Sequence, residues 1–314
     1  MPDASQWLRK LGALNVSRSK SKGPAPNKPL LVLAILDLAE EGLIGPDGLL
    51  RKDVQLHLRF RNYSPICAPR RGNKIDLDLP WEHLASDGLY RPPPQVKGVR
   101  PVVHPSPCST GLTPLADAVQ IDGSFLAAMA DPAFRLAARK VVIATYFPPD
   151  EQVALFAACG MDVPSGGELA KVREDQAAYK AQLRRGRCAR FASQVISGHR
   201  FTCALTGYRL TGPRGFALLE AAHIQAHALR GPDVPENGLA LTPTAHELFD
   251  AGLWTVDRDL RVVVARGAFE ESLLPTSPHF ALKALHGRPL FLPGALRPAE
   301  PFLAHHRTHT FHDA

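Results

Sequence analysis

The feature that most constrains this chain is a compact pattern of polar residues within the otherwise apolar stretch 201–256. A mostly apolar run ends at His223, as in a buried strand or hairpin arm, and a loop signal follows at Asn237. A proline then introduces a helix that carries His246 and Asp250. Because residues four apart share one helical face, these two side chains should lie together.

An imidazole and a carboxylate on one helical face form a mixed nitrogen and oxygen set that suits Mg²⁺, Mn²⁺, Ni²⁺ or Zn²⁺. Purely structural interpretations compete with this one. A histidine at a strand end is more often packed in a core, and a histidine and an aspartate at this spacing often form an ordinary surface pair. The ordered combination of histidine, asparagine and a second histidine favours a functional site.

Four sequence segments in this stretch resemble the HNH endonuclease family of the ββα-metal type. They occur in the family's order and spacing, and a fifth region near the C-terminus, around His305 and Phe311, resembles the tail of the same subgroup. The resemblance implies a small catalytic domain with two strands and a helix. The segments are Cys203–Gly207, Glu220–Ile224, Asn237–Leu239 and His246–Leu253.

The resemblance implies a role for each matching residue. His223 would be the general base that deprotonates the attacking water, a task suited to histidine, which titrates near neutral pH. Asn237 would orient the loop of the base by hydrogen bonding. His246, with Asp250 as its partner, would hold one divalent ion, Mg²⁺ or Mn²⁺ with Ni²⁺ and Co²⁺ as alternatives, next to the scissile phosphate.

Two positions depart from the family pattern. Many members carry a metal ligand directly before the general base, where this chain has Ala222, so Glu220 is the alternative first ligand. The cysteines of a structural zinc site are also missing, because Cys203 stands alone and Thr206 occupies the place of a second cysteine. We therefore expect packing to hold the hairpin, with no structural zinc.

Length and composition narrow the class of protein. A chain of 314 residues predicts two domains, and the net charge of +7 favours a polyanionic partner. The 5 cysteines are scattered and odd in number, which predicts reduced thiols in a cytoplasmic protein. The first ten residues lack an apolar core and no long apolar run follows, so we expect neither secretion nor a membrane partner.

The predicted fold class is α+β, with a mainly helical N-terminal domain and a small sheet, a linker helix and a C-terminal ββα-metal domain. The N-terminal domain is predicted at residues 1–150, the helical linker at 151–195 and the ββα-metal domain at 196–314. Within them, helices are expected at 5–16, 30–41, 51–61, 113–120 and 124–147, and short strands, turns and loops at 63–92.

The chain between residues 150 and 200, which includes the predicted linker helix, is predicted to be helical and becomes increasingly charged. Its arginines from 184 to 200 form a stripe that is either solvated or in contact with DNA. A second basic run, 17–23, lies near the N-terminus and has the same two interpretations. The arginines of the stripe are Arg184, Arg185, Arg187, Arg190 and Arg200.

The N-terminal half contains residues that resemble the sulfur-binding domain of phosphorothioate-dependent McrA-type restriction enzymes, in which such a domain precedes an HNH domain. Asn27 and Lys28 lead into a helix N-terminus, where free N–H groups favour an anion. The resemblance implies sulfur contacts at Asn27, Lys28, Leu79, Pro80 and His83. Candidate groove contacts are Arg70, Arg71, Lys20 and Lys22.

Taken together, the residues and resemblances predict a modification-dependent, type IV restriction endonuclease that recognises phosphorothioated double-stranded DNA. Two alternatives remain open: an HNH nuclease that reads another modification, such as 5-methylcytosine, and a catalytically inactive DNA-binding regulator. Cleavage of both strands by one metal site per chain suggests a homodimer, although a monomer that nicks twice is also consistent.

Overall fold

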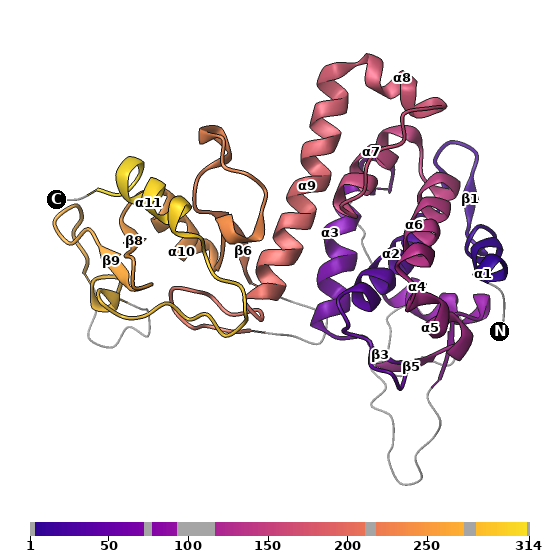
Figure 1. Cartoon of the computed structure of the whole chain (residues 1–314), viewed down its shortest axis with the longest axis horizontal. Coiled ribbons are helices and arrows are strands. Elements are labelled where there is room, and N and C mark those ends of the chain that lie inside the picture. Colours follow the sequence, from indigo (N-terminus) through magenta and orange to yellow (C-terminus); the bar gives the residue numbers. More distant parts are fainter. Residues whose placement is uncertain (1–3, 72–76, 93–116, 211–217, 273–280, 313–314) are drawn as a thin grey trace, which may run out of the picture. The chain divides into compact units, whose positions relative to one another are not determined.

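The structure is a computed structural model that describes residues 4–71, 77–92, 117–210, 218–272 and 281–312, with only the backbone given for 69–71. The chain divides into two compact units, and the second unit begins at Phe191 (Figure 1). The mixture of helices and small sheets confirms the predicted fold class.

The first unit is built around helix α2, Asn27–Glu40, whose residues from Leu30 to Leu36 are all buried. A helix that is apolar on every side must be covered on every side, which explains why the other helices pack around it. It ends before Gly42, which has a positive φ of 68°. Helices α3 Val54–Arg71, α4 Asp78–Leu84, α5 Gly123–Met129 and α6 Pro132–Tyr146 pack against it, and the unit also contains α1 Ala4–Leu11, α7 Pro149–Ala158, α8 Glu168–Glu174 and the first part of α9 Gln176–Gly198, which continues into the second unit.

Two of the predicted local structures in this unit are wrong. The prolines at 65 and 69 predicted turns, but α3 continues through them, because Tyr63, Ile66 and Cys67 are buried and packing fixes the helix. The expected helix at 113–120 is a strand where the structure describes it, β5 at Ala118–Ile121.

Strand β5 is the middle strand of a three-stranded antiparallel sheet. It pairs with β3, Leu49–Arg51, on one side and with β4, Tyr90–Arg91, on the other. The first unit also contains a hairpin of β1, Arg18–Ser19, and β2, Gly23–Pro24. The expected linker region contributes to this unit's core, because Val153, Leu155 and Phe156 of α7 are buried in it.

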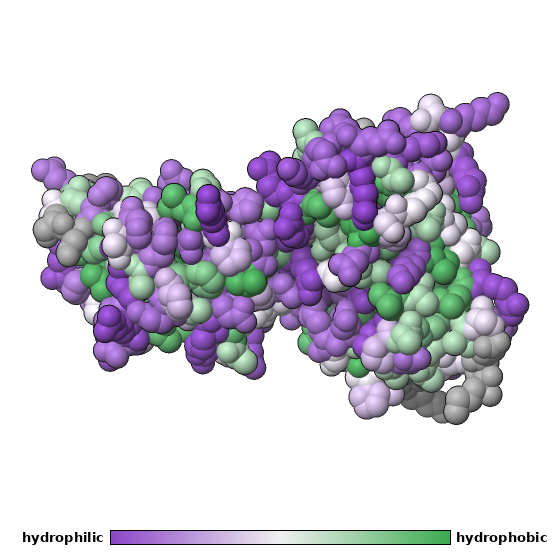
Figure 2. Space-filling view, turned by 45° about the horizontal axis from the view of Figure 1, so that its top comes forward, coloured by the Kyte–Doolittle hydropathy of each residue, from purple (hydrophilic) through white to green (hydrophobic). Residues whose placement is uncertain are grey.

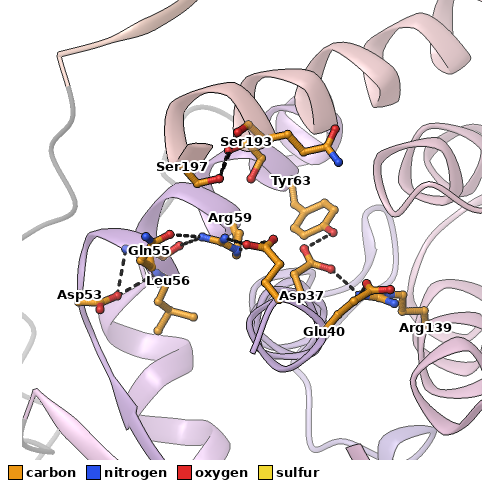
Figure 3. Close-up of polar contacts among 12 residues, drawn as sticks. Asp37, Glu40, Asp53, Gln55, Leu56, Arg59, Tyr63, Arg139, Ser193 and Ser197 are labelled. Carbon is orange, nitrogen blue, oxygen red and sulfur yellow. Dashed lines mark hydrogen bonds and ion pairs between the residues drawn. The ribbon is translucent and has the colours of Figure 1, made fainter. Parts of the chain in front are cut away.

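Two sets of polar contacts, around Asp37 and around Arg59, lie in the first unit (Figure 3). Asp37 accepts hydrogen bonds from Tyr63 Oη at 2.5 Å and from Arg139 Nη2 at 2.8 Å. Burial raises the pKa of Asp37, although Arg139 acts against that effect. Arg59 forms an ion pair with Glu41 and also donates to Gln55. These cations are therefore neutralised inside the unit.

The second unit contains the predicted two strands and helix. Strand β6, Glu220–His223, pairs antiparallel with β7, Gly238–Leu241, so that His223 lies opposite Gly238. Helix α10, Pro243–Asp250, follows and packs on both strands. The unit also contains a hairpin of β8, Trp254–Val256, and β9, Val262–Val264, and helix α11, Glu300–His309. The short helices η2 His227–Leu229, η3 Pro235–Asn237 and η4 Lys283–Leu285 lie in the connections, and η1 Ala85–Asp87 follows α4 in the first unit.

None of the helices in the described ranges is both long and apolar enough to span a bilayer. Hydrophilic residues cover most of the face seen in Figure 2, with hydrophobic ones scattered between them. Cys67, Cys159, Cys188 and Cys203 are free thiols, whereas Cys108 lies outside the described residues.

His306 on α11 should make the stability of the second unit depend on pH. Its ring stacks on Phe249 at 3.7 Å, Nε2 donates to the Phe249 carbonyl, and Nδ1 accepts from Thr255 Oγ1 at 2.9 Å, which satisfies a neutral imidazole. Burial lowers the pKa of His306 to about 4. Between pH 6.5 and 4 the unfolded chain therefore binds more protons than the folded chain, and up to about 3 kcal/mol of stability is lost as the pH falls through this range.

Denaturant unfolding at pH 7 and at pH 4.5 measures this effect. We expect His306→Gln to be less stable than the wild type at pH 7 and to lose less stability on acidification. His309→Gln, which replaces an exposed histidine on the same helix, should keep the wild-type pH dependence. An unchanged pH dependence in His306→Gln would contradict the assignment.

Candidate active site

His223 ends strand β6 and is held on two sides. Its Nε2 lies 2.9 Å from Asp233 Oδ1, and its ring stacks on Phe191 with centroids 4.0 Å apart and planes at 13°. The side chain of Asp233 is only 8% exposed and that of His223 is 20% exposed. A carboxylate only accepts hydrogen bonds, so Nε2 carries the proton and the Nδ1 lone pair is the one able to take up another.

Asn237 is fully buried and closes the loop that connects β6 to β7. Its Oδ1 accepts from Gln225 N at 2.9 Å, and its Nδ2 donates to the carbonyls of Gln225 and Pro232 at 3.1 and 3.0 Å. These bonds join both ends of the loop that carries Asp233. Asn237 therefore positions the partner of His223 without touching the imidazole itself.

Gly238 allows the end of α9 to approach this loop. A Cβ at Gly238 would lie 2.3 Å from Val195 and 2.9 Å from the Phe191 ring. Glycine is thus required for the packing that places Phe191 against His223.

His246 and Asp250 do share one face of α10, with 3.4 Å between His246 Nε2 and Asp250 Oδ2. The other ring nitrogen, Nδ1, lies 2.8 Å from Glu220 Oε2 at the start of β6. The Glu220 and Asp250 side chains are 52% and 62% exposed, and His246 is 24% exposed. The imidazole is therefore flanked by two carboxylates that open toward solvent.

The two histidines act on the same carboxylate. The pKa of Asp250 is raised, mainly by partial burial, while His246 and, more weakly, His223 lower it. The predicted general base ends β6, and the predicted metal ligands lie at the start of β6 and on α10, which packs on both β6 and β7.

The chemistry of these donors fits a divalent ion, since one imidazole and exposed carboxylates are ligands that Mg²⁺ and Mn²⁺ accept. Glu220 and Asp250 contact opposite nitrogens of His246, however, and no three His, Cys, Asp or Glu side chains of the described ranges are grouped for metal binding. His246 with one of the two carboxylates is the pair that fits an ion.

The two departures from the family pattern have structural consequences. Ala222 is completely buried, so its position faces the core and offers no place for a ligand. Cys203 is also buried, with Sγ 3.9 Å from Thr242 Oγ1. Both residues belong to the hydrophobic core of the second unit.

The predicted sulfur-contacting residues lie in the first unit. Lys28 forms an ion pair with Asp87 at 2.6 Å and also donates to the Asn15 carbonyl, which connects the start of α2 to the segment after α4. Pro80 is buried, while Asn27, Leu79 and His83 are half-buried. Lys20 and Lys22 are exposed in the β1–β2 hairpin, and the side chains of Arg70 and Arg71 lie outside the described residues.

The sequence interpretation missed Asp233 and Phe191. Asp233 lies in the sequence Gly231-Pro232-Asp233, which indicates only a turn. Phe191 lies in a helix that was interpreted as a linker. The one available signal was Gly238 beside Asn237, because a glycine next to a loop asparagine can mark a close approach of another element.

Residues 203–257 match the model of a family described as HNH endonuclease. Among solved structures, the chain is similar to one titled "Modification dependent TagI restriction endonuclease", at 24% identity over 38% of this chain and 37% of that chain, with a TM-score of 0.28. The matched part is well under two thirds of that chain.

No curated protein matches the chain significantly. The family match covers the general base candidate, the loop asparagine and the helix that carries His246 and Asp250, and it confirms the prediction of an HNH-type endonuclease. The chain therefore carries an HNH endonuclease domain, at residues 203–257.

Proposed function

We propose that this domain hydrolyses a DNA phosphodiester with His223 as the general base. The observation that carries the proposal is the hydrogen bond between His223 Nε2 and Asp233, which leaves Nδ1 as the proton acceptor. Nδ1 takes a proton from a water molecule, the water oxygen attacks phosphorus, and the bond to the 3′ oxygen breaks. Phe191 and Asp233 keep the imidazole in one orientation while the proton moves.

His246, with Glu220 or Asp250, would hold one divalent ion. When bound, the ion polarises the scissile phosphate and stabilises charge on the leaving oxygen. Asn237 contributes through the loop, since its three hydrogen bonds fix the backbone that presents Asp233 to the base. We assign Asn237 a positioning role on this basis.

The DNA that the chain selects is, in our proposal, duplex DNA carrying a phosphorothioate. Two features support this: the resemblance of the N-terminal residues to sulfur-binding domains, and the Lys28–Asp87 ion pair, which joins the two segments that carry the resemblance. Because Lys28 is already paired and Pro80 is buried, the half-buried Leu79 and His83 are the better candidates for touching sulfur.

A sulfur atom is larger and more weakly hydrated than the oxygen it replaces. An apolar surface such as Leu79 accepts it with little loss of hydration, whereas a phosphate oxygen would lose water there without gaining a partner. That difference is worth roughly 1–3 kcal/mol.

Recognition of 5-methylcytosine is the second enzymatic candidate, and a DNA-binding regulator is the non-enzymatic one. A cytoplasmic location and a homodimer remain predictions.

Cleavage of matched duplexes tests the proposal. With Mg²⁺ or Mn²⁺ present, we expect a duplex with one phosphorothioate to be cut about tenfold faster than the unmodified duplex, which corresponds to a preference of about 1.4 kcal/mol. A 5-methylcytosine duplex serves as the control, and a chelator should stop cleavage. Equal cutting of all three duplexes would overturn the sulfur assignment, and no cutting of any would favour the regulator.

A further inference from the structure

Helix α9 carries most of the chain's excess positive charge. Between residues 176 and 198 it contains Lys180, Arg184, Arg185, Arg187 and Arg190 and no aspartate or glutamate. The whole chain has a net charge of +7. These five cations therefore account for a large share of that excess and are not balanced within their own helix.

Three of these cations form a strip along one face, which we define as Lys180, Arg184 and Arg187. At about 100° per residue they lie within an arc of about 60°, and they extend about 10 Å along the helix axis. All three are exposed. Arg185 is also exposed but lies at least about 100° away from each of them around the helix.

The packing of α9 explains why this face is free. Gly186 packs against α7, where a Cβ would lie 2.1 Å from the Ala154 carbonyl oxygen. Tyr179, Leu183 and Ala189 pack against the core of the first unit. The centre of the strip is about a third of a turn away from Gly186, and Arg187 lies about 40° from Leu183, so the strip borders the packed face without being part of it.

The strip is not neutralised within the part of the chain that the structure describes. No ion pair is found there for Lys180, Arg184 or Arg187, whereas Lys28, Lys52, Arg59, Arg139 and Lys171 each pair with a carboxylate. Like charges three and four residues apart destabilise a helix. An unpaired strip of this kind is therefore unfavourable for the free protein and favourable only beside an anionic partner.

We propose that the strip binds the phosphate backbone of duplex DNA. Successive phosphates of one strand rise 3.4 Å along the duplex axis, so the strip's length of about 10 Å covers about three such rises. Lysine and arginine side chains at this spacing contact phosphates without reading bases or sulfur. The identification of the polyanion as DNA rests on the proposed function, while the strip itself is independent of the catalytic residues.

The salt dependence of DNA binding tests the strip. The measurement uses the full chain carrying His223→Ala, which removes cleavage, and an unmodified duplex, which removes any preference for sulfur. We expect Arg184→Gln to reduce the slope of log Kobs against log salt by about 0.9, and the triple change K180Q/R184Q/R187Q to reduce it by about 2 to 3.

Arg185→Gln is the matched control, because it removes the same charge from the adjacent residue but outside the strip. Its slope should equal that of the parent. Equal reductions for Arg184→Gln and Arg185→Gln, or no reduction in the triple variant, would overturn the proposal. A larger effect on single-stranded than on duplex DNA would also overturn it. None of these outcomes depends on cleavage or on sulfur, so failure of the proposed cleavage or of the proposed sulfur preference would leave the slope difference intact.

Discussion

Replacing His223 by alanine will abolish detectable DNA cleavage while the domain stays folded. The imidazole is the group whose Nδ1 lone pair is available once Asp233 has bound Nε2. Loss of a general base lowers the rate by about 10²- to 10⁴-fold. The rate of nicking of a duplex substrate with a divalent ion present measures the effect.

His309→Ala is a suitable control for this change. His309 is exposed on α11, and its recorded hydrogen bond is to the His305 carbonyl of its own helix. The His309→Ala variant should cleave DNA at the wild-type rate. Circular dichroism should show the same secondary structure in both variants, so that lost cleavage in His223→Ala reports on chemistry. A wild-type rate in His223→Ala would exclude this histidine as the base.

The order of elements in the second unit was predictable because local patterns determine it. The apolar run before His223, the loop at Asn237 and the proline that begins α10 each follow from nearby residues. The contact of His246 with Asp250 follows in the same way from helical spacing.

Contacts between distant residues could not be predicted in this way. The sequence indicated an anion site at the helix N-terminus beside Lys28, but it did not indicate the ion pair of Lys28 with Asp87, 59 residues further along the chain. In α3, the prolines suggested turns, and only the burial of Tyr63 and Ile66 explains the continuous helix. Where tertiary packing opposes a local preference, the sequence pattern alone favours the wrong structure.

Asp233 is the most informative example of this limit. Its sequence neighbours predict a turn with an exposed acid, yet the loop folds back so that the carboxylate reaches His223 and becomes almost completely buried. That arrangement depends on Asn237, which binds both Gln225 and Pro232. The hydrogen-bond partner of the general base can therefore be identified only from the folded loop.

Changing Asp233 to asparagine should therefore lower kcat by about 10- to 100-fold, as is typical when the hydrogen-bond partner of a functional histidine is lost. Asparagine has nearly the same shape, but its amide N–H can donate a hydrogen bond to Nε2 and so favour the tautomer in which Nδ1 carries the hydrogen. In that tautomer Nδ1 no longer accepts a proton from water. Since Asp233 is proposed to act through His223 and not on the DNA, KM should change little.

Asp233→Glu supplies the control, because it keeps a carboxylate that only accepts. It should recover part of the lost kcat, whereas a purely structural role for Asp233 would make glutamate the more harmful change, since the site is only 8% exposed and glutamate is longer.

Combining Asp233→Asn with His223→Ala gives a further test. If the carboxylate acts only by orienting the imidazole, the double variant should be no slower than His223→Ala alone, because residues that act as a unit are not additive. An additional loss in the double variant would show that Asp233 has a second role, independent of the base.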